Sequence, residues 1–105
     1  MSIIRMNEIQ GEKNKYGFTA KTLVSHQNAT VKNILIKNGD IIPEHSVPVD
    51  VFFYVVKGKG TIYINKEAFE VEDTDIVICP QNTEMSVSAN RNSDFSFLNV
   101  KTPSL

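Results

Sequence analysis

The sequence predicts a single all-β domain, built as an antiparallel barrel or sandwich. Short runs rich in β-branched and aromatic residues recur along the chain, and turn residues separate them at close spacing, which is the pattern of a sandwich or barrel. No window combines a capping residue with apolar residues at positions i, i+3, i+4 and i+7, so helix signals are nearly absent. The 105 residues allow one core, and residues 1–105 are therefore treated as one domain.

The first strands follow a polar N-terminal segment. Residues 1–16 are mostly polar and indicate an arm or an edge strand. Residues 18–25 are the first β-rich run, and the turn residues His-Gln-Asn at 26–28 end it. A second run at 30–36 stops at the sequence Lys-Asn-Gly-Asp at 37–40. The two runs therefore predict two strands with a short connection.

The middle of the chain carries the strongest strand signal. Residues 41–42 form a short extended piece that Pro43 is expected to end. Residues 51–57 are almost entirely β-branched or aromatic and predict the strongest strand. It stops at Gly58-Lys59-Gly60, where we expect both glycines to supply positive φ angles in a turn.

The C-terminal half predicts shorter strands joined by tight turns. A turn at Asn65-Lys66 would join two of them, and Pro80 would end a third. The expected strands are 61–64, 68–71, 76–79, 84–89 and 95–101.

Composition excludes several classes of partner. The net charge is -1, with 11 basic and 12 acidic residues and no charged run, so the sequence lacks the basic footprint of a nucleic-acid or membrane-surface protein. The apolar stretch 51–56 is too short to span a bilayer. Residues 1–5 lack the apolar core of a secretory signal, and the single Cys79 fits a reducing compartment. We therefore expect a cytoplasmic protein.

Two stretches of the sequence resemble the two motifs of the cupin superfamily. The first motif runs Gly-x5-His-x-His-x3-Glu-x6-Gly, and Gly39, His45 and Gly58 match its first, second and last positions. The second motif runs Gly-Asp-x4-Pro-x-Gly-x2-His, and Asp75 and Pro80 match it. The resemblance covers about half the chain. It implies the jelly-roll barrel, or double-stranded β-helix, of that superfamily.

The departures from these motifs concern the metal ligands that the resemblance implies. Val47 stands in place of the second His, Val51 in place of the Glu, and Met85 in place of the last His. Only His45 remains, and one imidazole does not make a transition-metal site. We therefore expect no metal and no other cofactor. The variant Val51→Glu is expected to be destabilised, because it would bury a carboxylate without a partner.

Alternation along the strands predicts what would line the barrel. If Val51 points inward, Phe53 does too, because residues two apart in a strand share a face. The expected ligand pocket is mostly apolar with one imidazole, as small-molecule pockets often are. The alternative is that His45 is an exposed relic and Met85 only fills the core. The pocket residues predicted here are His45, Val47, Val51, Phe53 and Met85.

Three functions remain open from the sequence. The first is a metal-free module that binds an unknown small molecule. The second is an isomerase-like or epimerase-like enzyme, because some cupins work without metal through a His base and a Tyr acid, which would make His45 the base. The third is a protein-interaction or regulatory module. The sequence assigns no catalytic residue beyond that possibility for His45.

A homodimer is also expected. Phe52, Tyr54 and Val56 alternate with the inward residues of the strongest strand, so its outer face is apolar too. A contiguous apolar patch on a surface usually marks an interaction site, and two-fold pairing is the commonest oligomer. The alternative is that residues 1–16 fold back over this face within one chain.

Overall fold

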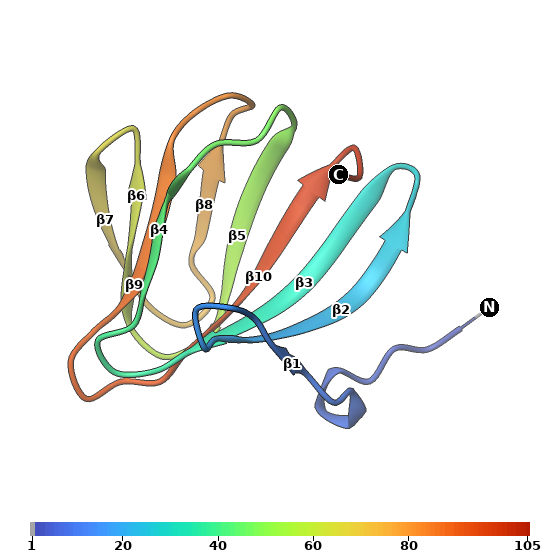
Figure 1. Cartoon of the computed structure of the whole chain (residues 1–105), viewed down its shortest axis with the longest axis horizontal. Helices are drawn as coiled ribbons and strands as arrows, with labels where there is room; N and C mark the ends of the chain where they lie inside the picture. Colours follow the sequence, from blue (N-terminus) through green and yellow to red (C-terminus); the bar gives the residue numbers. More distant parts are fainter. Residues whose placement is uncertain (1) are drawn as a thin grey trace.

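The computed structural model describes residues 2–105, and it consists almost entirely of antiparallel strands. Figure 1 shows a four-stranded sheet on the left and a six-stranded sheet that sweeps to the right as far as β2. The elements are η1 (Met6–Glu8), β1 (Glu12–Lys13), β2 (Thr19–His26), β3 (Ala29–Ile36), β4 (Ile41–His45), β5 (Asp50–Lys57), β6 (Gly60–Ile64), β7 (Glu67–Val71), β8 (Ile76–Cys79), β9 (Met85–Ala89) and β10 (Phe95–Thr102).

The strand order is that of a jelly roll. The six-stranded sheet runs β1-β2-β3-β10-β5-β8 and the four-stranded sheet runs β4-β9-β6-β7. From β3 onward the chain passes back and forth between the sheets, apart from the β6–β7 hairpin. We call the end at which β4, β8 and β10 finish the mouth, and the opposite end, where β5 finishes, the base. The predicted fold class is confirmed.

The predicted strands agree with the observed ones to within a residue or two, with one exception. Pro43 does not end the third strand, because β4 continues to His45. A proline is tolerated there since β4 is an edge strand. The register against β9 shifts between Ile42 and His45, which accommodates the missing N–H.

The core lies between the facing sides of the two sheets, which we call the inner faces. Phe53, Phe95 and Phe97 are each at most 2% exposed. The rings of Phe53 and Phe97 meet edge to face with centroids 5.7 Å apart, a favourable arrangement of their quadrupoles. Val55 and Ile62 are fully buried between the sheets. Alternation along each strand therefore places the apolar residues as predicted.

The two glycines after β5 have different reasons for being glycine. Gly58 has a φ of +100°, which favours glycine, and a Cβ there would also strike the Asp94 carbonyl. Gly60 does not have a positive φ, so the prediction for it was wrong. It begins β6, and a Cβ there would lie 2.6 Å from the Phe95 ring. Gly60 is therefore required by packing.

The N-terminal segment contains η1 and the two-residue edge strand β1. β1 pairs with the start of β2, and the Lys21 ammonium donates a 3.2 Å hydrogen bond to the Met6 carbonyl. The segment thus covers the outer face of the six-stranded sheet only near β2. Met1 lies outside the described residues. Across residues 2–105, no helix has the length and apolar character needed to cross a membrane.

Candidate functional site

His45 lies at the mouth, where it is the last residue of β4 and is exposed. Its pairing with Met85 places both residues on the inner side of the four-stranded sheet. The His45 Nδ1 lies 2.9 Å from the Pro43 carbonyl oxygen. Because a carbonyl can only accept, Nδ1 carries the hydrogen, and Nε2 of the neutral ring keeps its lone pair. The imidazole is thus available at the mouth as a hydrogen-bond acceptor.

The apolar residues predicted for the pocket are packed into the core. Val51, Phe53 and Met85 are 2%, 2% and 1% exposed, and Val47 packs against them while partly buried. The structure therefore brings these residues together beneath His45. They fill this part of the barrel as packed side chains and leave no open pocket between them.

The described residues do not assemble a metal site. No group of three His, Cys, Asp or Glu side chains among residues 2–105 could hold a metal ion. The Cys79 thiol is 1% exposed and points to the carbonyls of Pro80 and Thr83, at 3.7 and 3.6 Å. Burial raises the pKa of the Cys79 thiol, which disfavours the thiolate that metals and electrophiles require.

The inner face of the six-stranded sheet carries a polar patch that the sequence analysis missed. Residues directly opposite each other in neighbouring strands share a face. Val51 of the core is opposite Lys101, which is opposite Thr30, and Phe53 is in the same way opposite Asn99, which is opposite Lys32. The two rows continue onto β2. The polar patch consists of Thr22, Ser25, Thr30, Lys32, Asn99 and Lys101.

The polar patch is partly ordered and partly open to solvent. Asn99 and Thr30 are 8% and 5% exposed, whereas Lys32 and Lys101 are half-buried. The Lys101 ammonium donates a hydrogen bond to Asn99 Oδ1, and the hydroxyls of Thr30 and Ser104 are hydrogen-bonded to each other. The neighbouring Thr22 and Ser25 are exposed. This side of the interior is therefore accessible, unlike the side walled by β5 and β8.

The two lysines of the polar patch influence each other. Burial lowers the pKa of Lys101 below its usual value, and the positive charge of Lys32 lowers it further. Neither lysine forms an ion pair with a carboxylate of residues 2–105. Within the described part of the chain, the one ion pair joins Lys66 to Glu44 at 3.9 Å, and both side chains are exposed. Asp50, the acid nearest Lys101 on β5, accepts a 3.0 Å hydrogen bond from the Gln81 amide.

One lysine of the pair could have been found from the sequence. Phe95 and Phe97 mark the inward parity of the last strand, and the same parity continues to Asn99 and Lys101. Lys32 is harder, because both faces of β3 carry aliphatic residues and its inward parity is ambiguous. Only the pairing of β3 with β10 resolves it.

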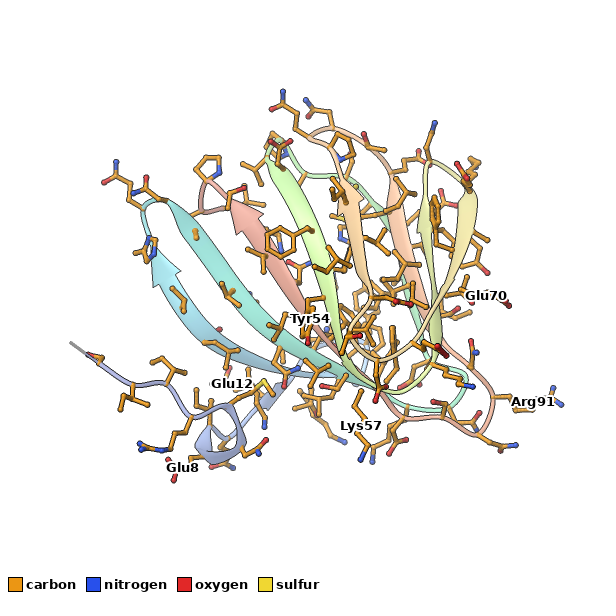
Figure 2. All side chains as sticks on the ribbon, turned by 180° about the vertical axis from the view of Figure 1, so that it is seen from behind. Glu8, Glu12, Tyr54, Lys57, Glu70 and Arg91 are labelled. Carbon is orange, nitrogen blue, oxygen red and sulfur yellow. The ribbon has the colours of Figure 1, made fainter. Side chains whose placement is uncertain are left out.

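A hollow lies at the base, at the opposite end of the barrel from His45. It has a volume of about 940 Å³ and lies between the end of β5 and the turn that joins β9 to β10. Figure 2 shows Lys57 and Arg91 at this lower end of the molecule. Its charged lining residues are Lys37, Lys57, Lys59, Asp73, Arg91 and Asp94.

The comparisons with known proteins begin with one family. The family model described as Cupin domain matches residues 33–101, well over half of the chain. No curated protein matches the sequence.

Solved structures show the same fold at low sequence identity. KdgF from a Halomonas species has a TM-score of 0.91 and 17% identity over 100% of this chain and 96% of its own. A protein described as a predicted oxalate decarboxylase from Thermotoga maritima has a TM-score of 0.89 and 19% identity, covering 97% and 99%. The nucleoside dehydratase Pac13, solved with uridine in variants of the Streptomyces protein, has a TM-score of 0.79 and 23% identity, covering 100% and 84%. Identities this low indicate a shared fold.

Proposed function

Because this chain belongs to the cupin family, we propose that its barrel binds a small molecule at the mouth, between His45 and the polar patch, without the transition metal typical of the family. The observation that carries this proposal is the polar patch, because the inner face of a barrel normally closes into an apolar core. Half-buried lysines, an amide and hydroxyls on an inner face are groups that fix the orientation of a ligand.

The solved structures of similar fold support the proposal that this site binds a small molecule. Pac13 is a nucleoside dehydratase whose variants were solved with uridine, and its barrel is superimposable on this one to a TM-score of 0.79. A small polar molecule is thus compatible with a barrel of this shape. The replacement of three family ligands by Val47, Val51 and Met85 supports binding that does not depend on a metal.

The test compares the two histidines of the chain. A library of small metabolites is screened by thermal denaturation and ligand-observed NMR, and hits are soaked into crystals. His45→Ala should fold normally, because the side chain is exposed, and should weaken binding of a hit that lies at the mouth. His26→Ala is the matched control, since His26 is also exposed but ends β2 on the outer side. Absence of any hit, or hits that both variants bind unchanged, would contradict the proposal.

The metal-free part has its own measurement. Elemental analysis of protein purified without chelators or a metal-binding tag should find no stoichiometric iron, manganese, nickel or zinc. Close to one such ion per chain would show that ligands have been missed.

A proton-transfer enzyme is the second candidate. It is favoured by the His45 ring, whose Nδ1 is held by Pro43 so that Nε2 can act as a base. It is disfavoured by the positions of the tyrosines, one of which would have to act as the acid near His45. Tyr54 and Tyr63 face outward, and Tyr16 precedes β2 at the base. Hydrogen–deuterium exchange into a bound ligand in D₂O, lost in His45→Gln, would establish it. A ligand that binds without such exchange would support binding as the function and would exclude this proton transfer.

We also propose that two copies of the chain pair through the outer face of the six-stranded sheet. Ile76 and Ile78 on β8 are 61% and 70% exposed, beside Phe52 and a hollow of about 460 Å³. Ile3 and Ile4 in the N-terminal segment are 74% and 50% exposed. One chain thus carries two separate uncovered apolar surfaces, and a two-fold pairing in which each N-terminal segment meets the partner's β8 would bury both.

A further inference from the structure

We propose that Lys32 and Lys101 bind an oxyanion, a carboxylate or phosphate group, of the ligand that occupies the mouth. This inference rests on the proposed function and adds the chemical class of the ligand. Lys32 and Lys101 are both half-buried and share the inner face that carries the polar patch, next to the apolar inner residues of β5.

The geometry places the two ammonium groups on one site. Lys32 is directly opposite Asn99, and Lys101 lies two residues further along β10 on the same face. Diagonal neighbours of this kind have Cα atoms about 7–8 Å apart, a separation that two long side chains easily bridge around a single anion. The positive charge of Lys32 lowers the pKa of Lys101, which is consistent with such proximity.

The charge of the pair is uncompensated within the described chain. Removing an ammonium group from water is costly unless a counter-charge replaces the lost hydration. Among the described residues the one ion pair joins Lys66 to Glu44, so neither Lys32 nor Lys101 is paired with a carboxylate there. An oxyanion between the two lysines would supply the missing charge and accept charge-assisted hydrogen bonds.

The surroundings leave donors free for such a group. An ammonium has three hydrogens, and the one described bond of Lys101 goes to Asn99 Oδ1. That bond holds the side chain along the inner face. The exposed hydroxyls of Thr22 and Ser25 extend the polar patch away from the lysines. They would suit further oxygens of the ligand, so the expected class is a hydroxylated organic acid or phosphate ester.

The cations at the base are a weaker site for an anion. Lys37, Lys57, Lys59 and Arg91 are exposed, where water screens their charge. Asp73 and Asp94 line the same hollow and offset part of that charge. The Gly58 amide also donates a 2.7 Å hydrogen bond to Asp73 Oδ1, so a carboxylate of the chain itself already lies at this end of the barrel.

The test is an NMR titration of the full chain with inorganic phosphate, acetate, glycolate and the neutral analogue glycolamide at constant ionic strength. Shifts should concentrate on β3 and β10 with the anions and be absent with glycolamide. Lys101→Met and Lys32→Met should each weaken anion binding on the order of tenfold, the effect of one charge-assisted hydrogen bond. Lys57→Met is the matched control and should bind as the unaltered protein does.

A second variant tests the site without removing either lysine. Val51→Glu places a carboxylate directly opposite Lys101, and should compete with the added anion and abolish its binding. Phosphate against acetate, titrated in competition, distinguishes a phosphate ester from a carboxylic acid as the preferred group.

Each remaining outcome overturns the inference in a recognisable way. Shifts confined to residues 90–94, or weakened by Lys57→Met, would place the anion at the base. Neutral library hits that depend on His45, together with anions that do not bind, would leave the proposed function standing and remove the oxyanion. If neither neutral molecules nor anions bind, both proposals fail.

Discussion

Val51 illustrates how a single neighbour changes the expected cost of a substitution. The sequence predicted that a glutamate at this position would be buried without a partner. The structure places Lys101 directly across the strand pair from it. The missing family ligand and the unneutralised lysine are therefore adjacent, and a carboxylate introduced at residue 51 would meet a cation.

We predict that Val51→Glu lowers the free energy of unfolding by about 1–2 kcal/mol, because the ion pair offsets part of the lost burial. Val55→Glu is the matched control: it is fully buried and lies opposite Phe97, so it should cost about 3–5 kcal/mol or prevent folding. Urea denaturation measures both. A double-mutant cycle with Lys101→Met should show favourable coupling, and additive losses would contradict the assumed register.

Lys101 should lower the free energy of unfolding of the unliganded protein. Because its pKa is lowered by burial and by Lys32, the unfolded chain binds more protons between the lowered pKa and the usual value of about 10.4. The free energy of unfolding should therefore rise as the pH increases through that window. The facing charged group on β3 is Lys32, while Asp50 on β5 is held by Gln81.

We predict that Lys101→Met raises the free energy of unfolding at neutral pH by about 1 kcal/mol, since it keeps the aliphatic stem and removes the desolvated charge. The variant should also lose the rise in the free energy of unfolding between the lowered pKa of Lys101 and its usual value. Urea unfolding across this range provides the measurement. A variant that is less stable than the parent at neutral pH would show that the Asn99 contact outweighs the buried charge.

Among the elements, the β6–β7 hairpin has the turn that its sequence predicts. Ile64 pairs with Glu67, and the two residues between them, Asn65 and Lys66, have φ angles of 51° and 68°. Two positive φ angles in a two-residue loop define a type I′ turn, for which Asn-Gly is the preferred sequence. Asn65 fits its position, whereas Lys66 occupies one that favours glycine.

We predict that Lys66→Gly stabilises the protein by about 0.5–1 kcal/mol, because it removes the steric cost of a left-handed side chain. The control Lys66→Ala keeps that cost and also removes the exposed contact with Glu44, which contributes little. It should be close to neutral. Thermal denaturation distinguishes the two, and equal effects would show that the turn is not under strain.

The strands could be predicted from the sequence because β-rich runs and turn residues alternate so regularly. The length of β4 could not, since a proline normally ends a strand and only its edge position allows it to continue. Asp75 and Pro80 of the second motif could be located for the same reason as the strands: each marks a turn that fixes a strand end. The polar patch depends on which strands pair, and that information is not local.

For the molecule as a whole, the outer face of the six-stranded sheet is the apolar surface that bears on assembly. One row across it reads Val24, Val31, Val100, Phe52 and Ile78. The N-terminal segment of the same chain reaches Lys21 at one side and leaves β8 uncovered. Residues 1–16 were expected either to cover this face or to leave it to a partner, and within residues 2–16 the covering is partial.

We predict a dimer at micromolar concentration by light scattering. Tyr54→Glu, on the outer face of β5 (Figure 2), and Ile78→Glu should each weaken it on the order of a hundredfold, as expected for hot-spot positions. Tyr63→Glu is the control, because Tyr63 is 36% exposed on the outer side of the other sheet, and it should leave the mass unchanged. A monomer whose stability is unaffected by Tyr54→Glu would remove the dimer.

The division of one inner face into an apolar half and a polar half has a consequence for engineering. On β5 and β8 the inner residues hold the sheets together, and a change at Phe53 or Val55 alters folding. On β2 the inner residues Thr22 and Ser25 are exposed and support no core packing. These two positions can therefore be randomised with little effect on folding. A library restricted to them would sample new ligand preferences on an unchanged scaffold.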